Sequence, residues 1–134
     1  MVILVVAAIG VLFLIRSPPA LAIELTPVPP ISVKQGGNFS IEISVRNDAG
    51  FFKAEAEHVQ GELKLPEGFI EESLQTGTRQ LLFGSISTGD ASHYGLTIIA
   101  LDTVEVGEYH AKLAVWGANT PTRESEIEIT VLAP

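Results

Sequence analysis

The fold of this chain is decided by the stretch Gly107–Trp116, which reads GEYHAKLAVW. Its side chains alternate between two sets, with Tyr109, Ala111, Leu113 and Val115 on one side and His110, Lys112, Ala114 and Trp116 on the other. A period of two residues places the two sets on opposite faces of an extended strand. Because the first set is apolar and the second is mixed, the pattern predicts a strand that buries one face in a core.

The same alternation recurs before and after this stretch, with turn residues at intervals of about 8 to 12 positions, which is typical of a β-sandwich. The sequence predicts a first strand that Pro27–Pro30 splits into 23–26 and 31–33, since proline is tolerated at sheet edges and not in central ladders. Further strands are predicted over 38–46, 58–65, 79–83, 93–101, 107–116 and 124–132. We therefore expect an all-β fold, a seven-stranded immunoglobulin-like sandwich over residues 23–134, preceded by one short N-terminal hydrophobic helix.

The segment Val2–Ile15 is an uninterrupted apolar run. As a helix it would extend roughly 21 Å at about 1.5 Å per residue, which is short of the ~30 Å hydrocarbon core of a bilayer. Pro18 and Pro19 would end such a helix near Ser17, because proline lacks a backbone N–H and its ring clashes with the preceding turn. We expect a membrane anchor or signal-anchor helix over 1–17 and a linker over 18–22.

The linker also contains Ala20-Leu21-Ala22, which has the small-x-small form of a signal-peptidase site, so cleavage after Ala22 is the alternative to a retained anchor. The charged region of a signal peptide is missing before Val2, which favours retention, and Arg16 would then extend its charged head to the membrane interface. Arg16 alone would place the rest of the chain in the cytoplasm, but one arginine is a small bias. We expect a single-pass protein of the cell membrane with an extracytoplasmic β-domain.

Charge and cysteine content exclude several classes of function. The chain has 16 acidic and 8 basic residues, a net charge of -8 that repels phosphate backbones and anionic headgroups. A nucleic-acid partner is therefore not expected. The sequence has no cysteine, so disulfides, thiolate metal sites and thiol nucleophiles are excluded within it.

Two groups of residues resemble chemical sites. Asp90, Ser92 and His93 bring a carboxylate, a hydroxyl and an imidazole close together, but residues so near along a turn cannot converge as a serine-histidine-carboxylate triad. His58, His93 and His110 are expected on three different strands, without the spacing of a shared metal site. We expect no catalytic residue, no metal site and no cofactor, and hence a protein that is not an enzyme.

A row of carboxylates is expected on the last strand, where Glu124, Glu126 and Glu128 share the outward face. Carboxylate oxygens suit a hard cation such as calcium. Charges on an exposed strand also discourage pairing with another chain. We favour this second interpretation.

Three aromatic residues are the expected contacts with a partner or with the membrane. Phe51 and Phe52 are adjacent and follow the turn residues Asn47–Gly50, so one of them has to face away from any core. Trp116 is expected on the outward face of its strand, where a large ring is often a contact. Asn38 begins the sequon Asn-Phe-Ser and is a possible glycosylation site.

Three stretches carry a family resemblance: VRNDAG at 45–50, LPEGF at 65–69 and GEYHAKLAV at 107–115. Together they resemble the CARDB-like and NPCBM-associated immunoglobulin-like domains of archaeal and bacterial cell-surface proteins, over roughly residues 23–132. The resemblance implies an immunoglobulin-like fold and a cell-surface location. Tyr109 also looks like the tyrosine corner of such sandwiches, in which the hydroxyl caps a backbone group. A shorter resemblance is to the single-span stator and pilin-like components of archaeal surface filaments.

We therefore expect a membrane-anchored extracytoplasmic module, structural or protein-binding, that acts as an accessory subunit of a membrane or cell-surface complex. Its partners would be other membrane or cell-surface proteins, with residues 1–17 in the membrane. The alternatives are a component of an archaeal surface filament or its stator, and a secreted carbohydrate-binding module after signal cleavage. An immunoglobulin-like order would also place the start of the first strand beside Phe51, Phe52 and Trp116, and Pro134 at the opposite end.

Overall fold

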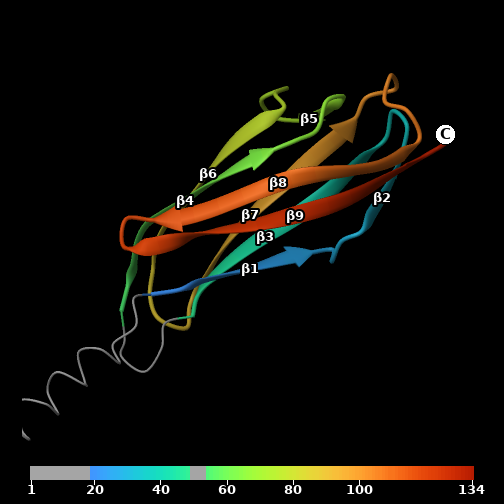
Figure 1. The fold of residues 1–134 in the computed structure, drawn as a ribbon. Helices are drawn as coiled ribbons and strands as arrows, with labels where there is room; N and C mark the ends of the chain where they lie inside the picture. Colours follow the sequence, from blue (N-terminus) through green and yellow to red (C-terminus); the bar gives the residue numbers. More distant parts are fainter. Residues whose placement is uncertain (1–18, 49–53) are drawn as a thin grey trace, which may run out of the picture.

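A computed structural model describes residues 19–48 and 54–134, and within these ranges the chain is a two-sheet β-sandwich without a helix (Figure 1). The all-β prediction is thus confirmed. The helix predicted over 1–17 lies outside the described residues. Within the described ranges there is no helix long and apolar enough to cross a bilayer.

The first sheet has four strands in the order β1-β3-β7-β5, and every neighbouring pair is antiparallel. Its long central strands are β3 (Asn38–Asn47) and β7 (Ala91–Ala100). The edges are β1 (Leu21–Thr26) and the short β5 (Phe69–Glu71). Ile41, Ile43 and Val45 of β3 point into the core, and the residues between them point outward.

The second sheet has five strands in the order β2-β9-β8-β4-β6. Its centre is β9 (Thr120–Leu132), β8 (Gly107–Gly117) and β4 (Ala56–Lys64), and β8 is antiparallel to both of its neighbours. The edge strand β6 (Thr78–Ile86) pairs antiparallel with β4. At the other edge, β2 (Ile31–Lys34) runs parallel to the end of β9.

The core lies between the two sheets and consists of the inward-facing residues that strand alternation assigns to it. Full burial of one large aliphatic side chain contributes about 1.5–3 kcal/mol, so these residues account for much of the favourable free energy of folding. Ala111, Leu113 and Val115 of β8 are buried as predicted. The largest fully buried side chains include Phe69, Ile41, Ile43, Leu63, Leu81, Ile98, Leu113, Ile127 and Ile129.

The predicted split of the first strand is confirmed, and its two halves belong to different sheets. β1 pairs with β3, whereas β2 pairs with β9 after the chain has passed Pro27–Pro30. Three of these four residues are prolines that have no N–H to give to a ladder, so the chain can leave one sheet here and join the other.

The predicted number of seven strands is wrong, because the described residues form nine. β1 and β2 are separate strands, and β5 was missed because three residues directly after the turn 66–68 are too few to show a period. The strand predicted over 79–83 continues through Gly84 to Ile86 as β6. Gly84 has a φ of 76°, a left-handed conformation that glycine adopts without a Cβ clash, and so the strand is not ended there.

The two ends of the sandwich differ in what they carry. One end, which we call the entry end, holds the start of β1, the end of β3, the start of β4 and the β8–β9 turn (Figure 1). There the Asp48 N–H donates to the Ala20 carbonyl at 2.7 Å, and the Ala118 N–H donates to the Glu57 carbonyl at 2.8 Å. Pro134 lies at the opposite end, which we call the far end (Figure 1). The start of β1 thus shares one end with the turn after Trp116, and Pro134 lies at the other, as predicted; Phe51 and Phe52 lie outside the described residues.

Candidate functional site

Hydrogen bonds hold the segments that enter and leave the β3–β4 connection. Asn47 is fully buried, and its Nδ2 donates to the carbonyls of Ala54 at 2.7 Å and Ile86 at 2.9 Å. The Thr88 Oγ1 accepts from the Ala54 N–H at 2.9 Å and contacts the Ala54 carbonyl at 3.0 Å. The residues on either side of 49–53 are therefore fixed to the body of the sandwich. Phe51 and Phe52 themselves lie outside the described residues.

The start of β4 is also fastened to the β8–β9 turn. The Asn119 side chain accepts from the Glu57 N–H and donates to the Glu55 carbonyl, each at 2.8 Å. Gly117 brings the turn close, because a Cβ at this position would lie 2.9 Å from the Glu57 carbonyl oxygen. The entry end is thus a bonded unit of four chain segments.

Trp116 lies on β8 one residue before Gly117, opposite Gln60 of β4. It alternates with the buried Val115 and is half-buried, so its ring is on the outer face of the second sheet as predicted. Its role as a contact remains a prediction.

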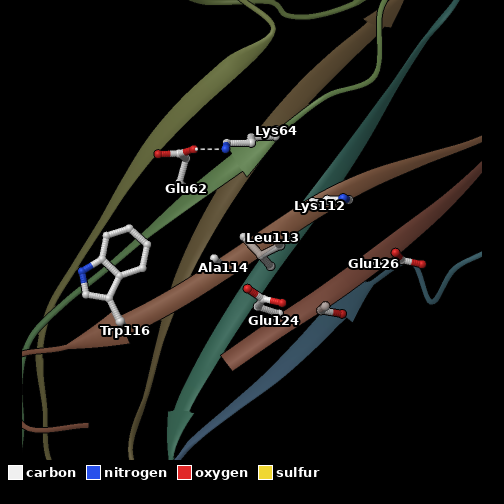
Figure 2. A pocket seen from close by; sticks show the side chains of 9 residues that line it. Glu62, Lys64, Lys112, Leu113, Ala114, Trp116, Glu124 and Glu126 are labelled. Atoms are coloured by element: carbon white, nitrogen blue, oxygen red, sulfur yellow. Dashed lines mark ion pairs between the residues drawn. The ribbon is translucent and has the colours of Figure 1, made fainter. Parts of the chain in front are cut away.

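Trp116 lines a hollow of about 410 Å³ on this outer face, and Figure 2 shows its lining side chains. Three strands supply the lining: β4, β8 and β9. The residues are Glu62, Lys64, Lys112, Leu113, Ala114, Trp116, Glu124, Ser125 and Glu126. Its volume is within the range of about 300–1,000 Å³ that is usual for small-ligand pockets.

The strand register explains how the hollow forms. Ala114 lies between Glu62 on β4 and Glu124 on β9, and its methyl side chain leaves a depression in the sheet surface. Along β8, Trp116 stands at one end of this depression and Lys112 at the other (Figure 2). A carboxylate therefore lies on each side of the floor, an aromatic ring at one end and an ammonium group at the other.

One short ion pair lies within the hollow, between Lys64 Nζ and Glu62 Oε1 at 3.4 Å (Figure 2). Glu126 Oε2 lies 3.7 Å from His110 Nδ1, and His110 is not one of the residues that line the hollow. Among the described residues, no basic nitrogen lies within 4.0 Å of the Glu124 carboxylate. Among the described residues, Glu62 and Glu126 thus each have an ion-pair partner, and the Glu124 carboxylate has none.

The predicted row Glu124, Glu126 and Glu128 is exposed on β9. β2 pairs only with Ile129–Leu132, so the earlier part of β9 has no ladder partner on that side within the described chain. Charges there fit the interpretation of edge protection. In the part of the chain that the structure describes, no three His, Asp or Glu side chains lie close enough together to hold a metal ion.

The residues that resembled a triad do not meet. Ser92 and His93 are adjacent on β7, so their side chains point to opposite faces of the sheet. The Ser92 Oγ donates to the Phe83 carbonyl at 3.1 Å, while His93 Nδ1 lies 3.1 Å from Glu42 Oε1 on the outer face. His58 and His110 are exposed on β4 and β8.

Asn38 is the exposed first residue of β3, opposite Ile99 of β7. Because β3 ends at the entry end, Asn38 lies toward the far end. The Ser40 Oγ of its sequon lies 3.2 Å from Thr97 Oγ1. Glycosylation of Asn38 remains a prediction.

Sequence analysis missed a buried carboxylate, Glu71, which is 3% exposed. The Ser73 hydroxyl contacts both of its oxygens at 2.7 Å, and the Leu74 N–H donates to Oε2 at 2.9 Å. Burial raises the pKa of Glu71, but the hydrogen bonds from Ser73 and Leu74, with the charge of Arg79, outweigh burial and lower the pKa below its ordinary value of 4.5. Arg79 is itself held by a hydrogen bond of 2.7 Å to the Tyr94 hydroxyl.

The sequence allows only part of the hollow and of the entry end to be predicted. Outward positions on single strands are readable from alternation, and Trp116 was identified in this way. Glu62 and Lys64 were missed, because only the pairing of β4 with β8 brings them into the same hollow as Trp116, opposite Ala114 and Lys112. Comparison with models of protein families finds no match to this chain, and comparison with curated proteins finds no significant match either.

Proposed function

We propose that this chain is a membrane-anchored, extracytoplasmic module of immunoglobulin-like type that binds another membrane or cell-surface protein as an accessory subunit. The observation that carries the proposal is the composition of the entry end. There the start of β1, the segments on either side of 49–53 and the β8–β9 turn form one hydrogen-bonded unit. A fixed frame of this kind is suited to present a loop to a partner.

The proposal assigns residues 1–17 to the membrane. The apolar run Val2–Ile15 supports this assignment, and Ala20 is bonded to Asp48 at the entry end. An anchor so close in sequence to Ala20 would hold the entry end near the bilayer surface. Phe51, Phe52 and Trp116 would then lie where aromatic rings are favoured, in the interfacial region or against a partner next to it.

A non-catalytic role is part of the proposal. It is supported by the separate contacts of Ser92 and His93. The Ser92 hydroxyl bonds to the Phe83 carbonyl and the His93 imidazole contacts Glu42, on opposite faces of one sheet. The filament and carbohydrate-binding alternatives remain predictions.

The proposal is tested with a variant in which Phe51, Phe52 and Trp116 are all replaced by serine. We expect it to lose most of its native partner during purification in mild detergent, while circular dichroism shows that the domain is folded. The matched control replaces three exposed apolar residues toward the far end, Leu74, Val106 and Leu132, by serine. Retention of the partner by the aromatic variant at the level of the control would contradict the proposal.

A further inference from the structure

We infer that the hollow beside Trp116 is a receptor for an arginine side chain of the protein partner. The inference rests on the proposed protein-binding function and adds the chemistry by which the partner is recognised. Its basis is the juxtaposition of one indole ring, one alanine floor and two flanking carboxylates on three neighbouring strands (Figure 2).

The shape of the hollow suits a long, planar side chain. Trp116 and Lys112 project from β8 on either side of Ala114, so the floor is low in the middle and bounded at both ends. A guanidinium group is planar and stacks on an indole face, whereas an ammonium group is compact and strongly hydrated. An arginine that enters over Ala114 would place its guanidinium beside the ring.

The charges of the hollow favour a cation at the same place. Glu62 and Glu124 flank Ala114 on either side of β8, and their backbones are about 9.6 Å apart, because neighbouring strands are about 4.8 Å apart. The Glu62 carboxylate already pairs with Lys64 and accepts a hydrogen bond from Gln80 Nε2 at 3.1 Å, so a guanidinium over Ala114 would donate chiefly to Glu124, while Glu62 adds negative charge. Glu124 has no basic partner within 4.0 Å among the described residues, so it is available to an incoming cation.

The two lysines define the orientation of the ligand. Lys64 is paired with Glu62, and Lys112 stands opposite Glu126 in the next row of the sheet. The Lys112 ammonium group therefore lies at the end of the hollow away from Trp116, where it repels an incoming cation, and the Lys64 ammonium group lies at the Glu62 carboxylate (Figure 2). The guanidinium is directed to the Trp116 end, which is also the end next to the entry end. The net charge of -8 adds long-range attraction for a basic partner.

The protein offers a direct reporter, because Trp116 is its only tryptophan. The full chain in detergent is titrated with the blocked tripeptide Gly-Arg-Gly, and indole fluorescence is recorded. The matched control ligand is Gly-citrulline-Gly, in which a neutral urea of the same shape replaces the guanidinium. We expect a saturable change with arginine, weakened by added salt, and binding of citrulline that is weaker by at least about tenfold.

Variants locate the binding in the hollow. The double variant Glu62→Gln with Glu124→Gln is expected to weaken arginine binding by at least about tenfold. Glu128→Gln is the matched control, because Glu128 lies on the same face of β9 beyond the hollow, opposite His110. It is expected to bind as the unmodified chain does.

Three results would overturn the inference: no saturable change with arginine, equal binding of citrulline, or unchanged binding by the double variant. A saturable change with a neutral oligosaccharide such as cellohexaose that persists in the double variant would also overturn it, in favour of sugar binding. If the variant with serine at 51, 52 and 116 loses the partner but any of these results is obtained, the arginine inference is wrong and the proposed function stands. A partner retained by the aromatic variant removes the proposed function.

Discussion

At the scale of the single residue, Glu71 shows how a charge is kept inside the sandwich. Its register with Ile98 turns the side chain inward, yet the turn after β5 returns a hydroxyl and an N–H to its oxygens. The sequence did not predict this burial, because an acidic residue after a turn has the pattern of a surface position. Only the pairing of β5 with β7 determines which way the side chain faces.

The lowered pKa of Glu71 predicts a pH-dependent contribution to stability. Because the pKa is lower in the folded than in the unfolded chain, Glu71 contributes its full stabilisation at pH values above its ordinary pKa of 4.5. This stabilisation is lost as the pH falls through the folded pKa. Glu71→Gln should therefore reduce the free energy of unfolding near neutral pH, by roughly 1.5–3 kcal/mol, as is typical of hydrogen bonds to a charged group. Urea unfolding of the two proteins at a series of pH values measures this difference.

The control for Glu71 is Glu72→Gln, since Glu72 is the exposed neighbour. At the acid end of the series, the Glu71 variant and the unmodified protein should converge in stability. A stability difference that does not change with pH would show that the amide disrupts packing and that the charge of Glu71 is not stabilising.

At the scale of the element, Tyr109 joins the start of β8 to the connection that precedes it. The Tyr109 hydroxyl donates to the Glu105 carbonyl at 2.7 Å, four residues upstream. Its ring meets Phe69 of β5 edge-to-face, with ring centroids 5.2 Å apart. The predicted hydrogen bond from the hydroxyl to a backbone carbonyl is confirmed. The contact with Phe69 also joins the connection between β7 and β8 to the edge strand β5.

Tyr109→Phe removes the hydroxyl and keeps the ring contact with Phe69. The hydrogen bond is exposed, so the expected loss of stability is about 0.5–1 kcal/mol, at the low end of the usual range. Urea unfolding measures the loss, with Glu105→Gln as a control that keeps the accepting carbonyl. An unchanged midpoint in Tyr109→Phe would contradict a stabilising corner.

Elements with a clear period of two were predictable, and the relations between them were not. The strands β3, β7, β8 and β9 were placed from alternation alone, because each buries every second residue over five positions or more. The three residues of β5 are too short for a period. The hollow depends on the registers Glu62–Ala114 and Ala114–Glu124, which no single strand contains.

At the scale of the whole molecule, the proposed function depends on which end of the sandwich faces the membrane, the entry end or the far end. The 13 residues of β9 run from one end to the other and span roughly 43 Å at about 3.3 Å per residue. If residues 1–17 lie in a membrane, the two ends are at very different heights above it. Trp116 and its hollow would be near the surface, and Asn38 would be farther from it.

The most direct test of this central claim measures the height of each end above the bilayer. The chain has no cysteine, so Ala118→Cys in the β8–β9 turn and Ala133→Cys at the far end each give one spin-labelling site. The full chain is reconstituted in liposomes that carry nickel-chelating lipid headgroups, and the relaxation enhancement of each label is recorded. We predict strong enhancement at position 118 and little at position 133, whereas equal enhancement at both positions, or the reverse order, would contradict the account.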